Sequence, residues 1–101
     1  MTGLTVLVVD PDARSRAQTV SALRTLGMHA LGVFLPTDAV ALLDGIVPDA
    51  VLVRSEEPDV AVQFLRRHTM LVEVDAQKSV EEALSAVLHA LGRQPEPQQL
   101  N

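Results

Sequence analysis

The chain has 101 residues, of which 48% are apolar and 21% are charged, and it contains no cysteine. One domain with a single core is the expected organisation, because chains of this length rarely divide into two folded halves. The lack of cysteine excludes disulfides, thiolate catalysis, iron–sulfur clusters and cysteine-ligated zinc.

Charge and aromatic content argue against nucleic acid as a direct ligand. Eight basic against thirteen acidic residues give a net charge of −5, which repels phosphate backbones. The two aromatic residues, Phe34 and Phe64, offer too little stacking surface for single strands. The sequence also has neither a signal-peptide pattern nor an apolar run long enough to cross a bilayer, so we expect a cytoplasmic location without membrane contact.

The first half of the chain alternates strand-like and helix-like segments. The run 4–9 is continuously apolar, which is typical of a strand buried on both faces of a parallel sheet. A helix follows and is expected to end before Gly27, where glycine favours helix termination. A second strand over 29–35 then leads into a short helix, for which we expect Thr37 as the N-cap.

The second half contains two further strand–helix pairs. Residues 50–53 form another continuously apolar strand, and a third helix is expected from Pro58 onward. The last helix is expected to run to Leu91 from a capping box made by Ser79 and Glu82.

The fourth strand, expected over 69–75, differs from the first and third because its apolar residues alternate. One face carries Met70, Val72 and Val74, and the other carries Leu71, Glu73 and Asp75. Such alternation predicts an edge strand with one solvated face.

Four strand–helix units in tandem predict an α/β fold, in which helices cover both faces of a parallel sheet. We place this domain at residues 1–93. The segment 94–101 is polar and proline-spaced, so we expect it to be a disordered tail.

Three stretches resemble the receiver domains of two-component response regulators. They read VLVVDPDARSRAQTVSALRTLG (6–27), PDAVLVRSEEPDV (48–60) and QKSVEEALSAVLHAL (77–91). The resemblance implies a flavodoxin-like, three-layer αβα fold. Only 24 positions separate Arg54 from Lys78, and a βαβ unit takes about thirty residues, so we expect a shortened version with four strands in the order 2-1-3-4.

The resemblance also implies a degenerate phosphorylation site. Asp10 matches the first of the family's two magnesium-binding acids, whereas Pro11 stands at the second, with Asp12 beside it. Arg54 stands at the position of the phosphoaccepting aspartate, and Lys78 is the candidate for the family's lysine. A guanidinium is no nucleophile and repels Mg²⁺, so we expect no catalysis, no metal and no other cofactor. Arg54 is expected either to pair with an acid at the adjacent strand end or to be solvated.

Loss of a helix and a strand would also uncover the edge and part of one face of the fourth strand. The resemblance implies a module of bacterial signalling or regulation, which we expect to be non-enzymatic and independent of phosphorylation. Its contact with a protein partner, or with a second copy of itself, is expected through residues 70–74 and the flanking helices.

Two alternatives remain open. The acidic turn at Asp10 and Asp12 also fits the DxD opening of haloacid-dehalogenase-like phosphatases. The chain could equally be the input module of a larger transcriptional regulator.

Overall fold

The computed structural model describes residues 3–54 and 59–92. Two expectations, a helix start at Pro58 and a tail over 94–101, lie outside these residues. In chain order the elements are β1 (Thr5–Val9), α1 (Ala13–Thr25), β2 (His29–Val33), α2 (Pro36–Leu42), β3 (Ala50–Val53), α3 (Val60–His68), β4 (Leu71–Glu73) and α4 (Val80–Gly92).

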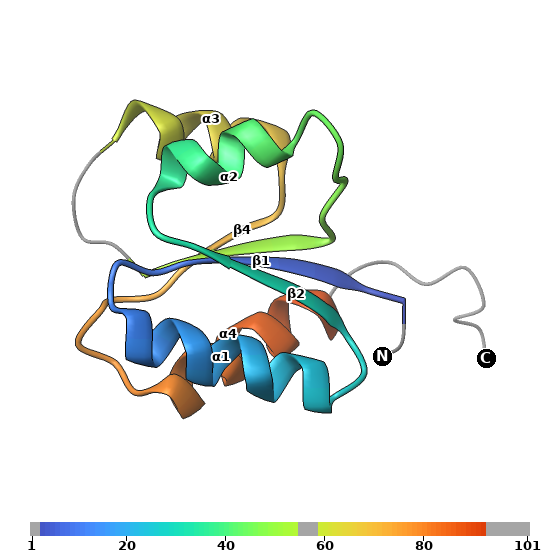
Figure 1. The fold of residues 1–101 in the computed structure, drawn as a ribbon, viewed down its shortest axis with the longest axis vertical. Helices are drawn as coiled ribbons and strands as arrows, with labels where there is room; N and C mark the ends of the chain where they lie inside the picture. The colour runs from blue at the N-terminus through green and yellow to red at the C-terminus, as the bar shows by residue number, and fades with distance from the viewer. Residues whose placement is uncertain (1–2, 55–58, 93–101) are drawn as a thin grey trace.

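The four strands are parallel and lie in the order β2-β1-β3-β4. Helices α2 and α3 cover one face of the sheet, and α1 and α4 cover the other (Figure 1). The predicted three-layer architecture and strand order are confirmed. Because all strands run the same way, the carboxyl ends of the two central strands, β1 and β3, meet at one edge of the molecule.

The core consists of two apolar clusters separated by the sheet. Alternate residues of the central strands supply each cluster, which explains why both strands are continuously apolar. The cluster beneath α1 and α4 contains Val6, Val8, Ala50 and Leu52, and the cluster beneath α2 and α3 contains Leu7, Val9, Val51 and Val53. These eight side chains are fully buried or nearly so.

Gly27 ends α1 as expected. Its φ of 91° is a left-handed conformation that disfavours side chains. Its N–H donates to the Arg24 carbonyl at 2.9 Å, and the N–H of Met28 donates to the Leu23 carbonyl at 3.1 Å. This pair of bonds is a Schellman motif, and it satisfies two carbonyls that the helix end leaves open.

The predicted N-cap of α2 is wrong. Leu35 occupies the N-cap position, and Pro36 takes the first helical turn instead of preceding it. Proline suits that turn because its φ is already helical and its missing N–H is not needed there. The N–H of Leu35 donates to the Asp38 carboxylate at 3.0 Å, so Asp38 rather than Thr37 supports the start of the helix.

The expectation of one solvated face on β4 holds only in part. Met70, Val72 and Val74 pack against the cluster beneath α1 and α4, and Glu73 is exposed on the other face. Leu71, however, is half-buried and packs against the cluster beneath α2 and α3. Helix α3 extends over this end of the sheet, so the face of β4 that we expected to be solvated is covered at Leu71.

Candidate functional site

Asp10 follows β1 and is only 2% exposed. Its carboxylate accepts hydrogen bonds from the N–H of Asp12 at 2.9 Å and from the hydroxyl of Ser15. Its backbone carbonyl accepts from Nη1 of Arg16 at 2.8 Å. All of these donors belong to the start of α1 and the turn before it, so this acid anchors the helix to the sheet.

Asp12 is the N-cap of α1. One oxygen of its carboxylate accepts from the N–H groups of Arg14 at 2.9 Å and Ser15 at 3.3 Å. Between the two acids, Pro11 is exposed and its side chain has no atom that could bind a cation. The acidic turn thus serves the helix N-terminus, which favours carboxylates because its N–H groups lack partners. Within residues 3–54 and 59–92 no group of three or more acidic, histidine or cysteine side chains is placed to hold a metal ion.

Arg54 follows β3 and is also only 2% exposed. Its backbone N–H continues the ladder to β1 by donating to the Val9 carbonyl at 2.9 Å. Its Nη2 donates to the carbonyl of Ala76 at 3.2 Å and to that of Lys78, both in the loop between β4 and α4. The side chain therefore ties the end of β3 to this loop.

Arg54 does not pair with Asp10, the acid after the adjacent strand β1, whose carboxylate accepts hydrogen bonds from the start of α1 instead. The ion pairs Arg66–Glu73 and Lys78–Glu82 do not involve Arg54 either. The guanidinium is buried rather than solvated. Its Nε and Nη1 have no hydrogen-bond partner in the described part of the chain. Such groups destabilise a fold by about 1–3 kcal/mol each.

Lys78 contributes its backbone rather than its ammonium to the site. Its carbonyl accepts from Arg54, whereas its Nζ lies 3.9 Å from Oε2 of Glu82 at the exposed start of α4. The capping box is confirmed, with Ser79 N–H to Glu82 at 3.0 Å and Glu82 N–H to the Ser79 hydroxyl at 3.1 Å. The bond from the Ser79 N–H, aided by the positive charges of Lys78 and Arg54, lowers the pKa of Glu82 below its usual value.

The structure brings together only some of the residues singled out from the sequence. Arg54 and the backbone of Lys78 meet, while Asp10 and Asp12 engage α1. Sequence reasoning missed Ser15 and Arg16, which hold Asp10 in place. Ser15 had a local signal, because it lies three residues after an N-cap aspartate, where a short polar side chain can reach back to the turn.

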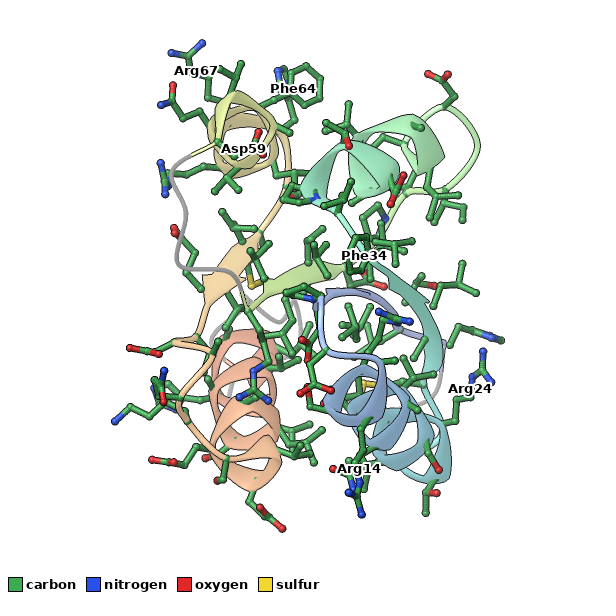
Figure 2. The ribbon with its side chains drawn as sticks, turned by 60° about the vertical axis from the view of Figure 1, so that its left-hand side comes forward. Arg14, Arg24, Phe34, Asp59, Phe64 and Arg67 are labelled. Atoms are coloured by element: carbon green, nitrogen blue, oxygen red, sulfur yellow. The ribbon has the colours of Figure 1, made fainter. Side chains whose placement is uncertain are left out.

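We expected exposed apolar side chains along β4, but the structure does not show them there. In the described residues the large exposed ones are Leu26, Leu31, Phe34, Leu35, Val47, Val60 and Phe64. Figure 2 shows Phe64 and Arg67 on the outer side of α3. Within residues 3–54 and 59–92, β4 pairs with β3 alone, so the backbone edge of β4 that faces away from β3 has no partner strand there.

A hollow of about 380 Å³ lies between α2 and α3, with Val40, Leu43, Val47, Phe64 and His68 in its lining. The rings of Phe64 and His68 lie 4.2 Å apart between centroids. The lining is mostly aliphatic and presents no cluster of catalytic side chains, so the hollow does not itself indicate a reaction.

No family model matches the chain, and no curated protein matches it by sequence. Solved structures do match its fold. The receiver domain of the Francisella response regulator 1452 gives a TM-score of 0.63 at 18% identity, covering 87% of this chain and 78% of that one. A response regulator receiver protein from Burkholderia phymatum gives 0.62 at 22% identity, covering 97% and 85%. The chain therefore has a receiver-like fold. No helix in its described part is long and apolar enough to cross a bilayer.

Proposed function

We propose that this chain is a receiver-like protein–protein interaction module of bacterial signalling or regulation that works without aspartyl phosphorylation. The observation that carries the proposal is the buried guanidinium of Arg54 at the carboxyl end of β3. An arginine there has no oxygen to accept a phosphoryl group, and its positive charge opposes binding of Mg²⁺.

The rest of the site supports the same proposal. A magnesium ion needs several oxygen ligands, yet the carboxylate of Asp10 is buried and accepts hydrogen bonds on both oxygens. Asp12 is already used as the N-cap of α1, and the side chain of Pro11 has no ligand atom. Binding of a cation would require these bonds to α1 to break.

Arg54 also supports a single conformation of the loop between β4 and α4. A switch needs two states and a ligand or modification that favours one of them. Here a permanent cation holds the Ala76 and Lys78 carbonyls, so the surface beside β4 is presented continuously. The docking region is the β4 edge, Met70 to Val74, together with the neighbouring sides of α3 and α4.

The proposal is tested by incubation with Mg²⁺ and acetyl phosphate, followed by intact mass measurement. We expect no adduct of about 80 Da, the mass of a phosphoryl group. Arg54→Asp alone is expected to remain unmodified, because the side chain of Pro11 still supplies no carboxylate oxygen. The matched variant combines Arg54→Asp with Pro11→Asp. It restores the phosphoaccepting aspartate and the second magnesium-binding acid, so we expect this double variant, unlike Arg54→Asp alone, to bind Mg²⁺. A Mg²⁺-dependent adduct on the unaltered chain would overturn the proposal.

The phosphatase alternative receives no support from the site. A nucleophilic carboxylate must reach the phosphorus atom of its substrate, but Asp10 is 2% exposed and held by the start of α1. Hydrolysis of a chromogenic phosphate ester that disappears in Asp10→Asn would favour the enzyme. A role as input module of a larger regulator is compatible with the same docking surface.

A further inference from the structure

The two outer strands of the sheet have unequal edges. In β2 the N–H of His29 donates to the Leu4 carbonyl at 2.8 Å, so the backbone of the next residue, Ala30, faces away from the sheet. Arg24 of α1 occupies that position: its Nε and Nη2 donate to the Ala30 carbonyl at 3.1 and 2.8 Å. Figure 2 shows Arg24 beside this edge. A cationic side chain laid over an edge blocks the approach of another strand.

No side chain of the described residues hydrogen-bonds to the edge of β4 in this way. The carbonyl of Met70 accepts from β3 at 2.9 Å, and the N–H of Val74 donates to Val53 of β3 at 3.0 Å. The alternation of the ladder then directs the backbone groups of Leu71 and Glu73 outward. Within residues 3–54 and 59–92, no donor or acceptor meets these two N–H and two C=O groups.

These four groups are arranged symmetrically about Val72. If a second β4 lies antiparallel with a two-fold axis through Val72, Leu71 of each copy faces Glu73 of the other. Each of the two facing pairs then exchanges two N–H···O bonds. We propose that a second copy of this chain docks on the β4 edge in this register and joins the two sheets into one. The inference rests on the proposed function in taking β4 as the docking edge.

Side chains on both faces fit this register. On one face, Glu73 of the two copies would lie diagonally across the axis, where like charges destabilise pairing. Arg66 prevents this repulsion, because its Nη2 and Nε lie 2.6 and 3.2 Å from Oε2 of Glu73 in the same chain. On the other face, Val72 meets its own copy, with Met70 and Val74 on either side of it.

The flanking helices enlarge the contact beyond the short strand. β4 has three residues, and four backbone hydrogen bonds alone contribute little net affinity in water. Figure 2 shows β4 at the outer side of the sheet with α3 and α4 on either side of it. The corresponding helices of a second copy would therefore lie beside them across the axis.

The first test removes one outward donor. Glu73→Pro deletes the N–H that the second copy needs and leaves the hydrogen bonds to β3 in place, because those involve the neighbouring residues. Glu73→Gln is the matched control, since it keeps the N–H. In sedimentation velocity at roughly tens of micromolar, we expect a dimer for the unaltered chain and the glutamine variant. We expect at least about tenfold weaker association for the proline variant, with circular dichroism verifying that it folds.

Arg66→Ala provides a second variant that does not depend on tolerance of proline. Its side chain is 54% exposed, so the monomer should fold normally. We expect dimerisation to weaken severalfold at low salt, to recover as salt screens the two Glu73 charges, and to be rescued by adding Glu73→Gln. A structural role of Arg66 within the monomer would not produce this salt dependence or this rescue.

Amide hydrogen exchange then identifies the edge directly. Leu71 and Glu73 are expected to gain protection as the protein concentration rises. A chain that stays monomeric at about 100 µM, or a dimer in which these two amides remain unprotected, would overturn the second-copy inference. The proposed function is tested separately: a phosphoryl adduct in the mass measurement would refute it, whether the chain is a monomer or a dimer.

Discussion

Replacing Arg54 by methionine removes a buried charge and keeps a flexible apolar side chain that fills part of the same space. The change removes two hydrogen bonds from a charged donor to the carbonyls of Ala76 and Lys78, a loss of about 1.5–3 kcal/mol each. It also removes two buried nitrogens, Nε and Nη1, that have no partner in the described residues, a gain of about 1–3 kcal/mol each. Because the losses and the gains are of similar size, the free energy of unfolding of Arg54→Met should lie within about 1 kcal/mol of that of the unaltered chain.

Two further substitutions make the comparison specific. Arg54→Ala loses the same hydrogen bonds and leaves a cavity as well, so we expect it to be less stable than the methionine variant by about 2–4 kcal/mol. Arg54→Lys keeps a buried charge but gives up the planar array of donors, so we expect it to be less stable than Arg54→Met too.

Urea denaturation followed by circular dichroism measures these differences, and hydrogen exchange over residues 75–79 reports the loop. We expect faster exchange of the loop in both Arg54→Met and Arg54→Ala, because the tie to β3 is lost. If the methionine variant is as unstable as the alanine variant, the two carbonyl bonds outweigh the buried charge. If its loop exchanges at the original rate, Arg54 does not hold the loop.

Three smaller perturbations test the local structure. A Cβ at Gly32 would lie 2.8 Å from Cγ of Arg16, so Gly32→Val should cost about 1–3 kcal/mol in a thermal melt; an unchanged melting temperature would contradict this close packing. Gly27→Ala should cost about 1 kcal/mol in urea, because φ is 91° there. The lowered pKa of Glu82 means that its bond with Ser79 stabilises the fold above the ordinary value of 4.5 and is lost as pH falls through the lower folded value. The stability gap between the unaltered chain and Glu82→Gln should therefore narrow on acidification, and a gap that is constant with pH would refute the assignment.

Acidic and basic side chains have distinct structural roles in this chain. Several acids accept from N–H groups at helix starts, namely Asp12, Asp38, Asp59 and Glu82. Three arginines instead donate to backbone carbonyls at the ends or edges of strands or in the following loop, namely Arg16, Arg24 and Arg54. Both arrangements satisfy backbone groups that regular structure leaves open. These three arginines bind backbone carbonyls, whereas Arg66 pairs with the carboxylate of Glu73.

Much of the fold was predictable because it depends on neighbours in the sequence. The continuous apolar runs of β1 and β3 require burial on both faces, and that requirement predicts a parallel sheet between helices. The ends of two helices were equally readable, since Gly27 and the Ser79–Glu82 pair act on groups within a few residues. The N-cap of α2 was predicted two positions too late, at Thr37 instead of Leu35, because Pro36 fits the first helical turn and Asp38 bonds the Leu35 N–H.

The candidate site was predictable only in residue type. The sequence predicted that Arg54 stands where a receiver domain has its phosphoaccepting aspartate, and that the side chain of Pro11 offers a cation no ligand. Tertiary structure alone decided that Arg54 is buried and that its acceptors are carbonyls 22 and 24 residues away. It also decided that Arg24 covers one edge of the sheet, while no described residue covers the other. Every residue has a carbonyl, so no side-chain pattern indicates which of them a distant guanidinium will reach; that is set by how the elements pack.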